Sequence, residues 1–119
     1  AQRMLKQHPH LFLLAETGGK NATIVTGLSD RDQTIKNVLH SAFSHSGQKC
    51  SATSLLLLEE EVFEDTNFRE QFVDAISSMS VGSAWELKNK MGPLIRPPSG
   101  ALLRGLKELE HGESWAVLP

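Results

Sequence analysis

The amino-acid sequence predicts an α/β fold in which helices flank a largely parallel sheet. Three observations support this prediction. Short apolar or β-branched runs of strand length recur along the chain, amphipathic helical segments lie between them, and glycine or proline marks most of the boundaries. Strands that alternate with helices are typical of parallel pairing, because a parallel pair needs a long crossover connection.

The N-terminal part of the chain contains two predicted strands and one predicted helix. Residues 11–15 form a continuous apolar run, which is typical of a strand buried on both faces. Residues 22–26 are β-branched and predict a second strand. A capping sequence at residues 29–32 opens an amphipathic helix, and we expect this helix to stop at Gly47.

The middle of the chain continues the alternation. Residues 53–58 predict a third buried strand, and the acidic run 59–61 closes it as a solvated strand end rather than as a metal site. Asp65 or Thr66 caps a second amphipathic helix that ends near Gly82.

The C-terminal part begins with a looser segment and then predicts one more helix and one more strand. Residues 97–99 open the helix, which carries leucines along one face and is followed by Gly112. Residues 115–118 predict a last strand, after which the chain stops. We therefore expect residues 1–119 to be part of a larger sheet.

Length, charge and composition limit the function classes. The 119 residues allow one domain or a piece of one, and the net charge of −2 argues against a nucleic-acid partner. No apolar run approaches the roughly 18 residues of a membrane span. Residues 1–3 contain neither an initiator Met nor a signal peptide, so we expect the chain to start inside a longer protein. The single cysteine rules out an internal disulfide and favours a reducing compartment, either bacterial cytoplasm or an organelle matrix.

Two loops carry side chains suited to catalysis. Cys50 lies in the loop 48–51 between a predicted helix and strand, where it is either a nucleophile or a small buried apolar residue. Glu16 directly follows the first predicted strand and precedes Gly18 and Gly19, so it is either a base for water or the cap of a turn. The glycines and Lys20 do not form a P-loop, because the required glycine spacing and the following Ser or Thr are missing.

The five histidines favour structural or surface roles. His40 and His45 lie five positions apart on the predicted helix, a poor arrangement for sharing a metal ion. No metal site is therefore predicted. A Cys-His pairing of the hydrolase type stays open, although no spacing in the sequence supports it.

Residues 16–21 (ETGGKN) and 46–52 (SGQKCSA) together resemble the paired signature of the aldehyde dehydrogenase superfamily. In that family a Glu-Leu-Gly-Gly-Lys type box precedes a Gly-Gln-x-Cys box at similar spacing. Thr17, Asn21 and the residues around Cys50 look like those of the 1-pyrroline-5-carboxylate dehydrogenases. Residues 91–95 and 112–115 are similar to the dehydrogenase half of bifunctional bacterial proline-utilisation enzymes.

The resemblance implies a mechanism and its residues. Cys50 would attack the aldehyde carbon, and its backbone N–H would hold the oxyanion. A hydride would pass to NAD or NADP, with Gly18 near the nicotinamide, and Glu16 would then activate water to hydrolyse the thioester. Ser51 would contact the carboxylate end of the substrate. The implied reaction oxidises glutamate semialdehyde, the open form of 1-pyrroline-5-carboxylate, to glutamate in proline breakdown.

Several structural features of enzymes in this family have no counterpart in residues 1–119. These are the dinucleotide-binding Rossmann domain, the side-chain amide of the oxyanion hole, a ribose-binding Glu and the oligomerisation strands. We therefore expect a partial catalytic domain that neither binds NAD(P) tightly nor turns over an aldehyde alone and that tends to self-associate, within an enzyme that is a homo-oligomer. The alternatives are another semialdehyde dehydrogenase, or a cysteine hydrolase or acyl-transferase, which needs a His beside Cys50. The choice between NAD and NADP, and the fusion of a proline dehydrogenase half, stay open.

Overall fold

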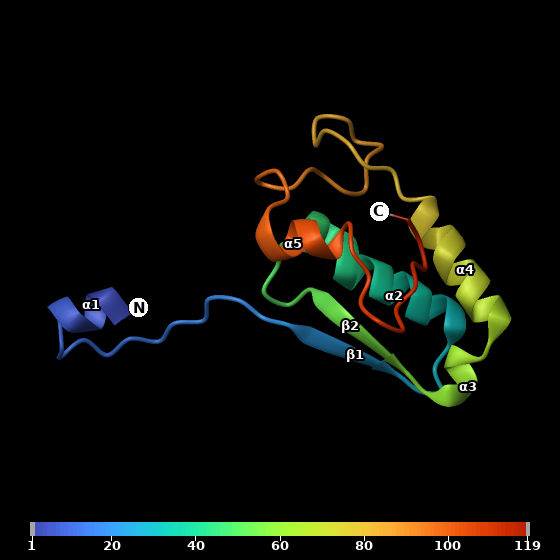
Figure 1. Cartoon of the computed structure of the whole chain (residues 1–119), viewed down its shortest axis with the longest axis horizontal. Coiled ribbons are helices and arrows are strands. Elements are labelled where there is room, and N and C mark those ends of the chain that lie inside the picture. Colours follow the sequence, from blue (N-terminus) through green and yellow to red (C-terminus); the bar gives the residue numbers. More distant parts are fainter. Residues whose placement is uncertain (1, 119) are drawn as a thin grey trace.

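The computed structural model describes residues 2–118, and its centre is a two-stranded parallel sheet with helices on one side (Figure 1). The elements, in chain order, are α1 (Gln2–Gln7), β1 (Asn21–Val25), α2 (Arg31–Phe43), the 3₁₀ helix η1 (Ser44–Gly47), β2 (Thr53–Leu58), α3 (Glu60–Phe63), α4 (Thr66–Ser77) and α5 (Gly100–Gly105).

β1, α2 and β2 form a parallel strand–helix–strand unit. Ala22 lies opposite Leu55 and Val25 opposite Leu58, and α2 makes the crossover that parallel strands require. The register shifts between Asn21 and Ala22, so β1 begins with an irregularity. The predicted α/β class, the two strands and the helix between them are confirmed.

Aspartates begin the two long helices: Asp30, within the predicted capping sequence 29–32, begins α2, and Asp65, one of the two predicted caps, begins α4. Asp30 accepts a hydrogen bond of 2.8 Å from the backbone N–H of Gln33, and Asp65 accepts one of 3.1 Å from that of Phe68. The Phe68 N–H holds the pKa of the Asp65 carboxyl below its usual value, and Arg31 adds to this effect. The Arg31 guanidinium lies 3.5 Å from Asp65 and so connects the start of α2 to the start of α4.

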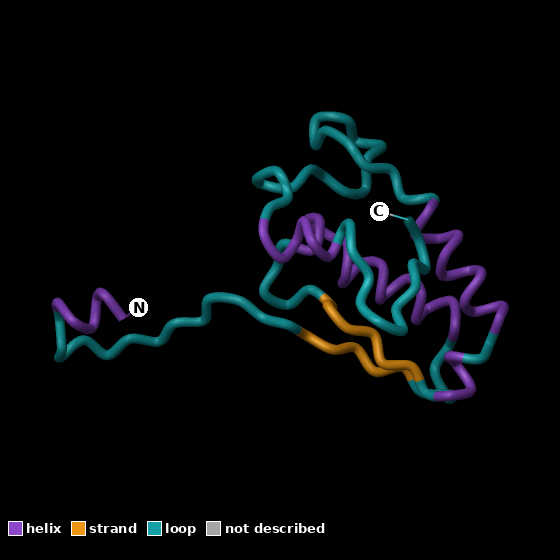
Figure 2. The backbone as a smooth tube through the Cα atoms, in the orientation of Figure 1, coloured by secondary structure: helices purple, strands orange, loops and turns teal. Residues whose placement is uncertain are grey.

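The core lies between the sheet and helices α2, α3 and α4; α2 and α4 lie on one side of the sheet, and α3 lies at the end of the strands (Figures 1 and 2). Its buried members are Val25 of β1, Ile35 of α2, Val62 of α3 and Phe68 of α4. The Phe72 ring stacks on Phe68 with their centroids 5.9 Å apart. Each element brings an apolar side chain to one cluster, and this cluster holds the strand–helix–strand unit together.

The opposite face of the sheet is apolar and is covered by none of the described residues. It presents Ala22, Ile24, Leu55 and Leu57, and Ile24 is 72% exposed. The prediction that residues 53–58 form a buried strand is therefore only partly correct, because β2 forms but one of its faces is exposed in the described chain. An uncovered apolar face of this kind is the feature that would promote the expected self-association, which stays a prediction.

The N-terminal arm, residues 2–20, extends away from the rest of the molecule (Figure 1), except at residues 16–19, which lie beside residues 47–50. Its residues 11–20 form neither helix nor strand, and Phe12 is 86% exposed, so the strand predicted at residues 11–15 is wrong. A strand needs a hydrogen-bonded neighbour, and in the described chain this segment has none. The arm also contains the unpredicted helix α1, and it raises the radius of gyration to 17.9 Å, against roughly 13.5 Å for a compact chain of this length.

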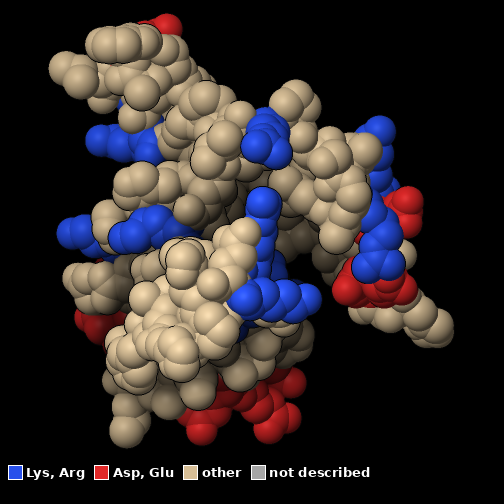
Figure 3. Space-filling model, turned by 90° about the vertical axis from the view of Figure 1, so that its left-hand side faces the viewer, with Lys and Arg blue, Asp and Glu red and all other residues tan. Residues whose placement is uncertain are grey.

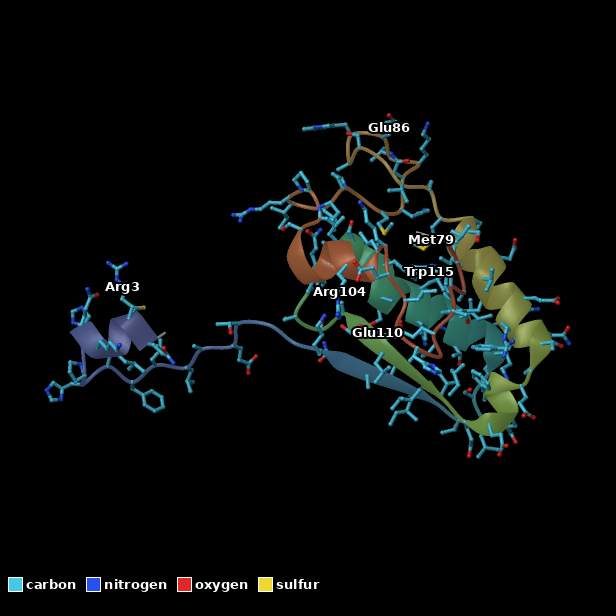
Figure 4. The ribbon with its side chains drawn as sticks, in the orientation of Figure 1. Arg3, Met79, Glu86, Arg104, Glu110 and Trp115 are labelled. Atoms are coloured by element: carbon cyan, nitrogen blue, oxygen red, sulfur yellow. The ribbon has the colours of Figure 1, made fainter. Side chains whose placement is uncertain are left out.

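The C-terminal part differs from its prediction in two ways. The last helix, α5, stops at Gly105 instead of near Gly112, and residues 115–118 form no strand. Leu102 is 50% exposed, so the predicted leucine face has too little to pack against to extend the helix. Arg104 of α5 faces Glu110 across an exposed ion pair of 3.1 Å (Figure 4).

The acidic run 59–61 begins a helix. Glu59 is the N-cap of α3, and its carboxylate accepts a hydrogen bond from the Gly27 N–H at 2.6 Å. One group of acidic side chains lies at the lower edge of the molecule, at the level of α3, and others lie beside basic side chains on the right (Figure 3). Negative charge suits the first turn of a helix.

Among residues 2–118, none of the helices has the length and apolar character that a membrane span requires.

Candidate active site

Glu16 and Cys50 lie along one shallow pocket of about 400 Å³, built by two loops. Residues 16–19 form one wall and residues 47–50 the other. Both loops lead into the strands, the first into β1 and the second into β2, so the pocket lies at the amino ends of the sheet. The expectation that Glu16 follows a strand is wrong, because the segment before it is not one.

A left-handed turn shapes the loop that carries Cys50. His45, Ser46 and Gly47 have φ values of 55°, 57° and 69°. The two non-glycine residues each lose about 1 kcal/mol or more in this conformation. Helix α2 therefore ends at Phe43, four residues before the predicted stop at Gly47.

Gln48 and Ser46 attach the Cys50 loop to residues 92–95. The side chain of Gln48 accepts from the Ile95 N–H at 2.9 Å and donates to the His45 carbonyl at 2.9 Å. The Ser46 hydroxyl donates to the Gly92 carbonyl. The sequence did not predict this contact; its only signal was the similarity of residues 91–95 to proline-utilisation enzymes.

Asn21 attaches the other side of the Cys50 loop to the start of β1. Its side-chain amide donates to the Cys50 carbonyl at 2.6 Å and to the Ala52 carbonyl at 3.0 Å. Ala52 in turn donates its N–H to the Lys49 carbonyl at 3.1 Å, which closes the turn around Cys50. In the sequence, Asn21 is notable only as a family feature, and these bonds were not predicted.

The two glycines beside Glu16 have different surroundings, and we predict different effects of substitution. A Cβ on Gly19 would overlap the Cys50 carbonyl oxygen, whereas a Cβ on Gly18 would meet no atom within 4 Å. Gly19→Ala should therefore lower the free energy of unfolding by about 1–3 kcal/mol. Gly18→Ala should change it by less than about 0.5 kcal/mol. Urea denaturation of both variants measures this difference, and equal losses would contradict the observed close approach of the two loops.

The other two predicted site residues, Gly18 and Ser51, differ in their relation to this pocket. Ser51 is exposed and is not among the residues that line the pocket, while Gly18 is among them. No histidine lines the pocket, and no hydrogen bond joins Cys50 to a histidine within residues 2–118. His45 lines a different pocket with residues of the 82–92 segment. This arrangement disfavours a Cys-His hydrolase.

The chemistry available in the pocket is that of an exposed thiol, a carboxylate and backbone N–H groups. The backbone N–H of Cys50 donates to no other residue in the described part of the chain. No cluster of three or more potential metal ligands occurs within residues 2–118. A thiol nucleophile and a carboxylate base, with a free N–H beside the nucleophile, suit acyl chemistry on a carbonyl substrate.

Comparison with known proteins gives a family match and relatives with several names, among them malonate-semialdehyde dehydrogenase, PutA and 1-pyrroline-5-carboxylate dehydrogenase. Residues 3–118 match the profile of the aldehyde dehydrogenase family. The bifunctional protein PutA of Klebsiella aerogenes is 41% identical over 95 residues, which are 80% of this chain and 7% of that protein. The 1-pyrroline-5-carboxylate dehydrogenase of Bacillus subtilis is 32% identical over 106 residues, which are 89% of this chain and 20% of that protein.

A solved structure agrees with these sequence relatives. The structure of Proline Utilization A from Corynebacterium freiburgense superimposes with a TM-score of 0.78 at 49% identity. The match covers 84% of this chain and 10% of that one. The chain spans 7% of the length of the Klebsiella protein and 20% of that of the Bacillus protein.

Proposed function

Because the chain belongs to the aldehyde dehydrogenase family, we propose that it is the cysteine-bearing segment of an enzyme that oxidises an aldehyde with NAD(P). Family membership confirms the resemblance of the chain to the aldehyde dehydrogenase superfamily, which was predicted from the two sequence boxes at residues 16–21 and 46–52. The observation that carries the proposal is the pocket in which Glu16 and Cys50 lie together although 34 positions separate them in the sequence. In this proposal residues 1–119 are a partial catalytic domain, and the dinucleotide-binding domain is a separate part of the enzyme.

Cys50 is the proposed nucleophile. Its thiolate adds to the aldehyde carbon, and the carbonyl oxygen becomes the oxyanion of a thiohemiacetal. The Cys50 N–H, which has no acceptor among the described residues, is free to donate to that oxyanion. Loss of a hydride from the same carbon leaves a thioester on the sulfur.

Glu16 is the proposed general base for the second half of the reaction. Its carboxylate takes a proton from water, the resulting hydroxide attacks the thioester carbon, and the Cys50 thiolate leaves. Glu16 is exposed on the opposite wall of the pocket from Cys50, which leaves space for a water molecule between the two loops.

NAD(P), when bound, supplies the hydride acceptor. Gly18 is proposed to lie near the nicotinamide, and the open space beside it supports this, because a Cβ there would meet no other part of the described chain within 4 Å. Dinucleotide affinity in this family of folds comes mainly from a Rossmann crevice, so residues 1–119 alone should not bind NAD(P) tightly. Ser51, next to the nucleophile, is proposed to contact the carboxylate of the substrate.

The proposed substrate is glutamate semialdehyde, the open form of 1-pyrroline-5-carboxylate, with glutamate as the product. The names of two relatives support it, one a 1-pyrroline-5-carboxylate dehydrogenase and the other a bifunctional PutA protein. In this proposal the enzyme acts in proline breakdown. Another semialdehyde dehydrogenase is the alternative within the same chemistry.

The test is a series of aldehydes offered to the complete enzyme, with reduction of NAD and of NADP followed by absorbance. We expect glutamate semialdehyde to have a kcat/KM at least about tenfold above that of succinate semialdehyde, malonate semialdehyde and propanal. A higher value for a shorter semialdehyde would identify the alternative substrate. Acid formation from esters or amides, without reduction of either cofactor with any aldehyde, would instead identify a hydrolase.

A further inference from the structure

The side chain of Asn21 holds the backbone on both sides of Ser51. One amide nitrogen donates to the Cys50 carbonyl at 2.6 Å and to the Ala52 carbonyl at 3.0 Å, so both of its N–H groups are used. Asn21 is half-buried and is the first residue of β1, at the point where the strand register is irregular. Its side chain thus joins the Glu16 loop to the Cys50 loop across 29 positions of sequence.

Two neighbours hold the Cys50 carbonyl. It accepts the Asn21 bond and also lies against the backbone of Gly19, where a Cβ would overlap it. Because the peptide unit is planar, a fixed carbonyl fixes the whole Cys50–Ser51 peptide and one backbone dihedral of Cys50. The direction of the Cys50 Cα–Cβ bond, and so the set of positions open to the sulfur, then depends on Asn21.

We propose that Asn21 is a positioning residue for the nucleophile, which aims the Cys50 sulfur into the pocket by holding the carbonyl of Cys50. The inference rests on the proposed function, in which Cys50 attacks the aldehyde. Asn21 touches neither substrate nor cofactor in this proposal and acts only through the backbone of Cys50. Misplacing a reacting group by about 1 Å costs up to roughly 100-fold in rate.

The decisive variant is Asn21→Leu, which keeps the approximate size of the side chain and removes both donors without adding charge. Its matched control is Asn37→Leu, on the exposed face of α2, where Asn37 accepts a hydrogen bond from Gln33 at 2.8 Å. Asn21→Gln keeps the amide and is the conservative variant. Thermal unfolding of all three proteins shows whether each is folded before its kinetics are compared.

In the complete enzyme we expect Asn21→Leu to lower the rate of the first turnover, seen as the burst of reduced cofactor, by roughly 10- to 100-fold. The KM for NAD(P) should stay within about twofold, because only the nucleophile is displaced. Asn21→Gln should recover part of the rate, and Asn37→Leu should match the wild type. A normal burst rate in folded Asn21→Leu would overturn the proposal.

A second measurement does not depend on the proposed function. Hydrogen exchange of the Ala52 N–H, which donates to the Lys49 carbonyl, reports the order of the Cys50 turn in the 119-residue chain. Asn21→Leu should speed this exchange at least about tenfold relative to Asn37→Leu, and unchanged exchange would overturn the proposal. If the wild-type enzyme oxidised no aldehyde, the proposed function would fail, while exchange would still decide whether Asn21 orders the loop.

Discussion

Cys50→Ser in the complete enzyme is expected to lower the kcat for aldehyde oxidation by roughly 1,000-fold or more. A serine hydroxyl is a far weaker nucleophile than a thiolate unless a neighbouring base activates it. The pocket around Cys50 contains no histidine that could take that role, and its carboxylate, Glu16, lies on the opposite wall. Steady-state turnover and the first-turnover burst should therefore both disappear.

The same variant should keep its fold and its affinity for NAD(P). The Cys50 side chain is exposed, and the bonds that hold its loop use backbone atoms of Cys50 and Ala52 and the side chains of Asn21 and Gln48. Thermal unfolding and cofactor titration of Cys50→Ser and Cys50→Ala test this point. Persistent turnover in either variant would remove Cys50 from the mechanism, whereas loss of cofactor binding would mean that its role is structural.

The elements that could be predicted from the sequence are those whose signals are local. The aspartates that begin α2 and α4 bind N–H groups three positions away, and β1 and β2 share the core that their own helices cover. Each of these elements finds its partners within residues 21–77, so sequence pattern and structure agree there.

The failed predictions concern apolar runs with no partner in the described chain. Residues 11–15 and 115–118 have strand composition, but a strand forms only where a neighbouring edge lies within hydrogen-bonding reach. Apolar periodicity records a preference for burial and carries no information about which segment provides it. The same limit explains the short α5, whose leucines are partly exposed.

In the candidate site, too, some features could be predicted from the sequence and others could not. The sequence boxes single out Glu16 and Cys50 by their residue types, and in the structure both residues line one pocket. The bonds of Asn21 and Gln48 join residues 29 to 47 positions apart, and no periodic pattern predicts such contacts. The left-handed conformations of His45 and Ser46 have no local signal either, since only Gly47 is a residue type that favours them.

Glu16→Gln should separate the two halves of the reaction. Glutamine has nearly the same size as glutamate but does not accept a proton from water, so thioester hydrolysis should slow while attack by Cys50 and hydride loss continue. We expect the steady-state kcat to fall by roughly 100-fold or more, in line with the usual contribution of a general base. The rate constant of the first-turnover burst should stay within about threefold of the wild type.

Stopped-flow measurement of reduced cofactor shows both phases in one trace, and Glu70→Gln is the matched control. Glu70 is exposed on α4 and does not line the pocket, so the control makes the same charge change away from the site. The control should give wild-type burst and steady-state rates. If the burst vanished in Glu16→Gln, Glu16 would act before the thioester forms, for example as the base that deprotonates Cys50. If both phases kept their wild-type rates, another group would activate the water, because a base that is removed without effect on hydrolysis is not the base.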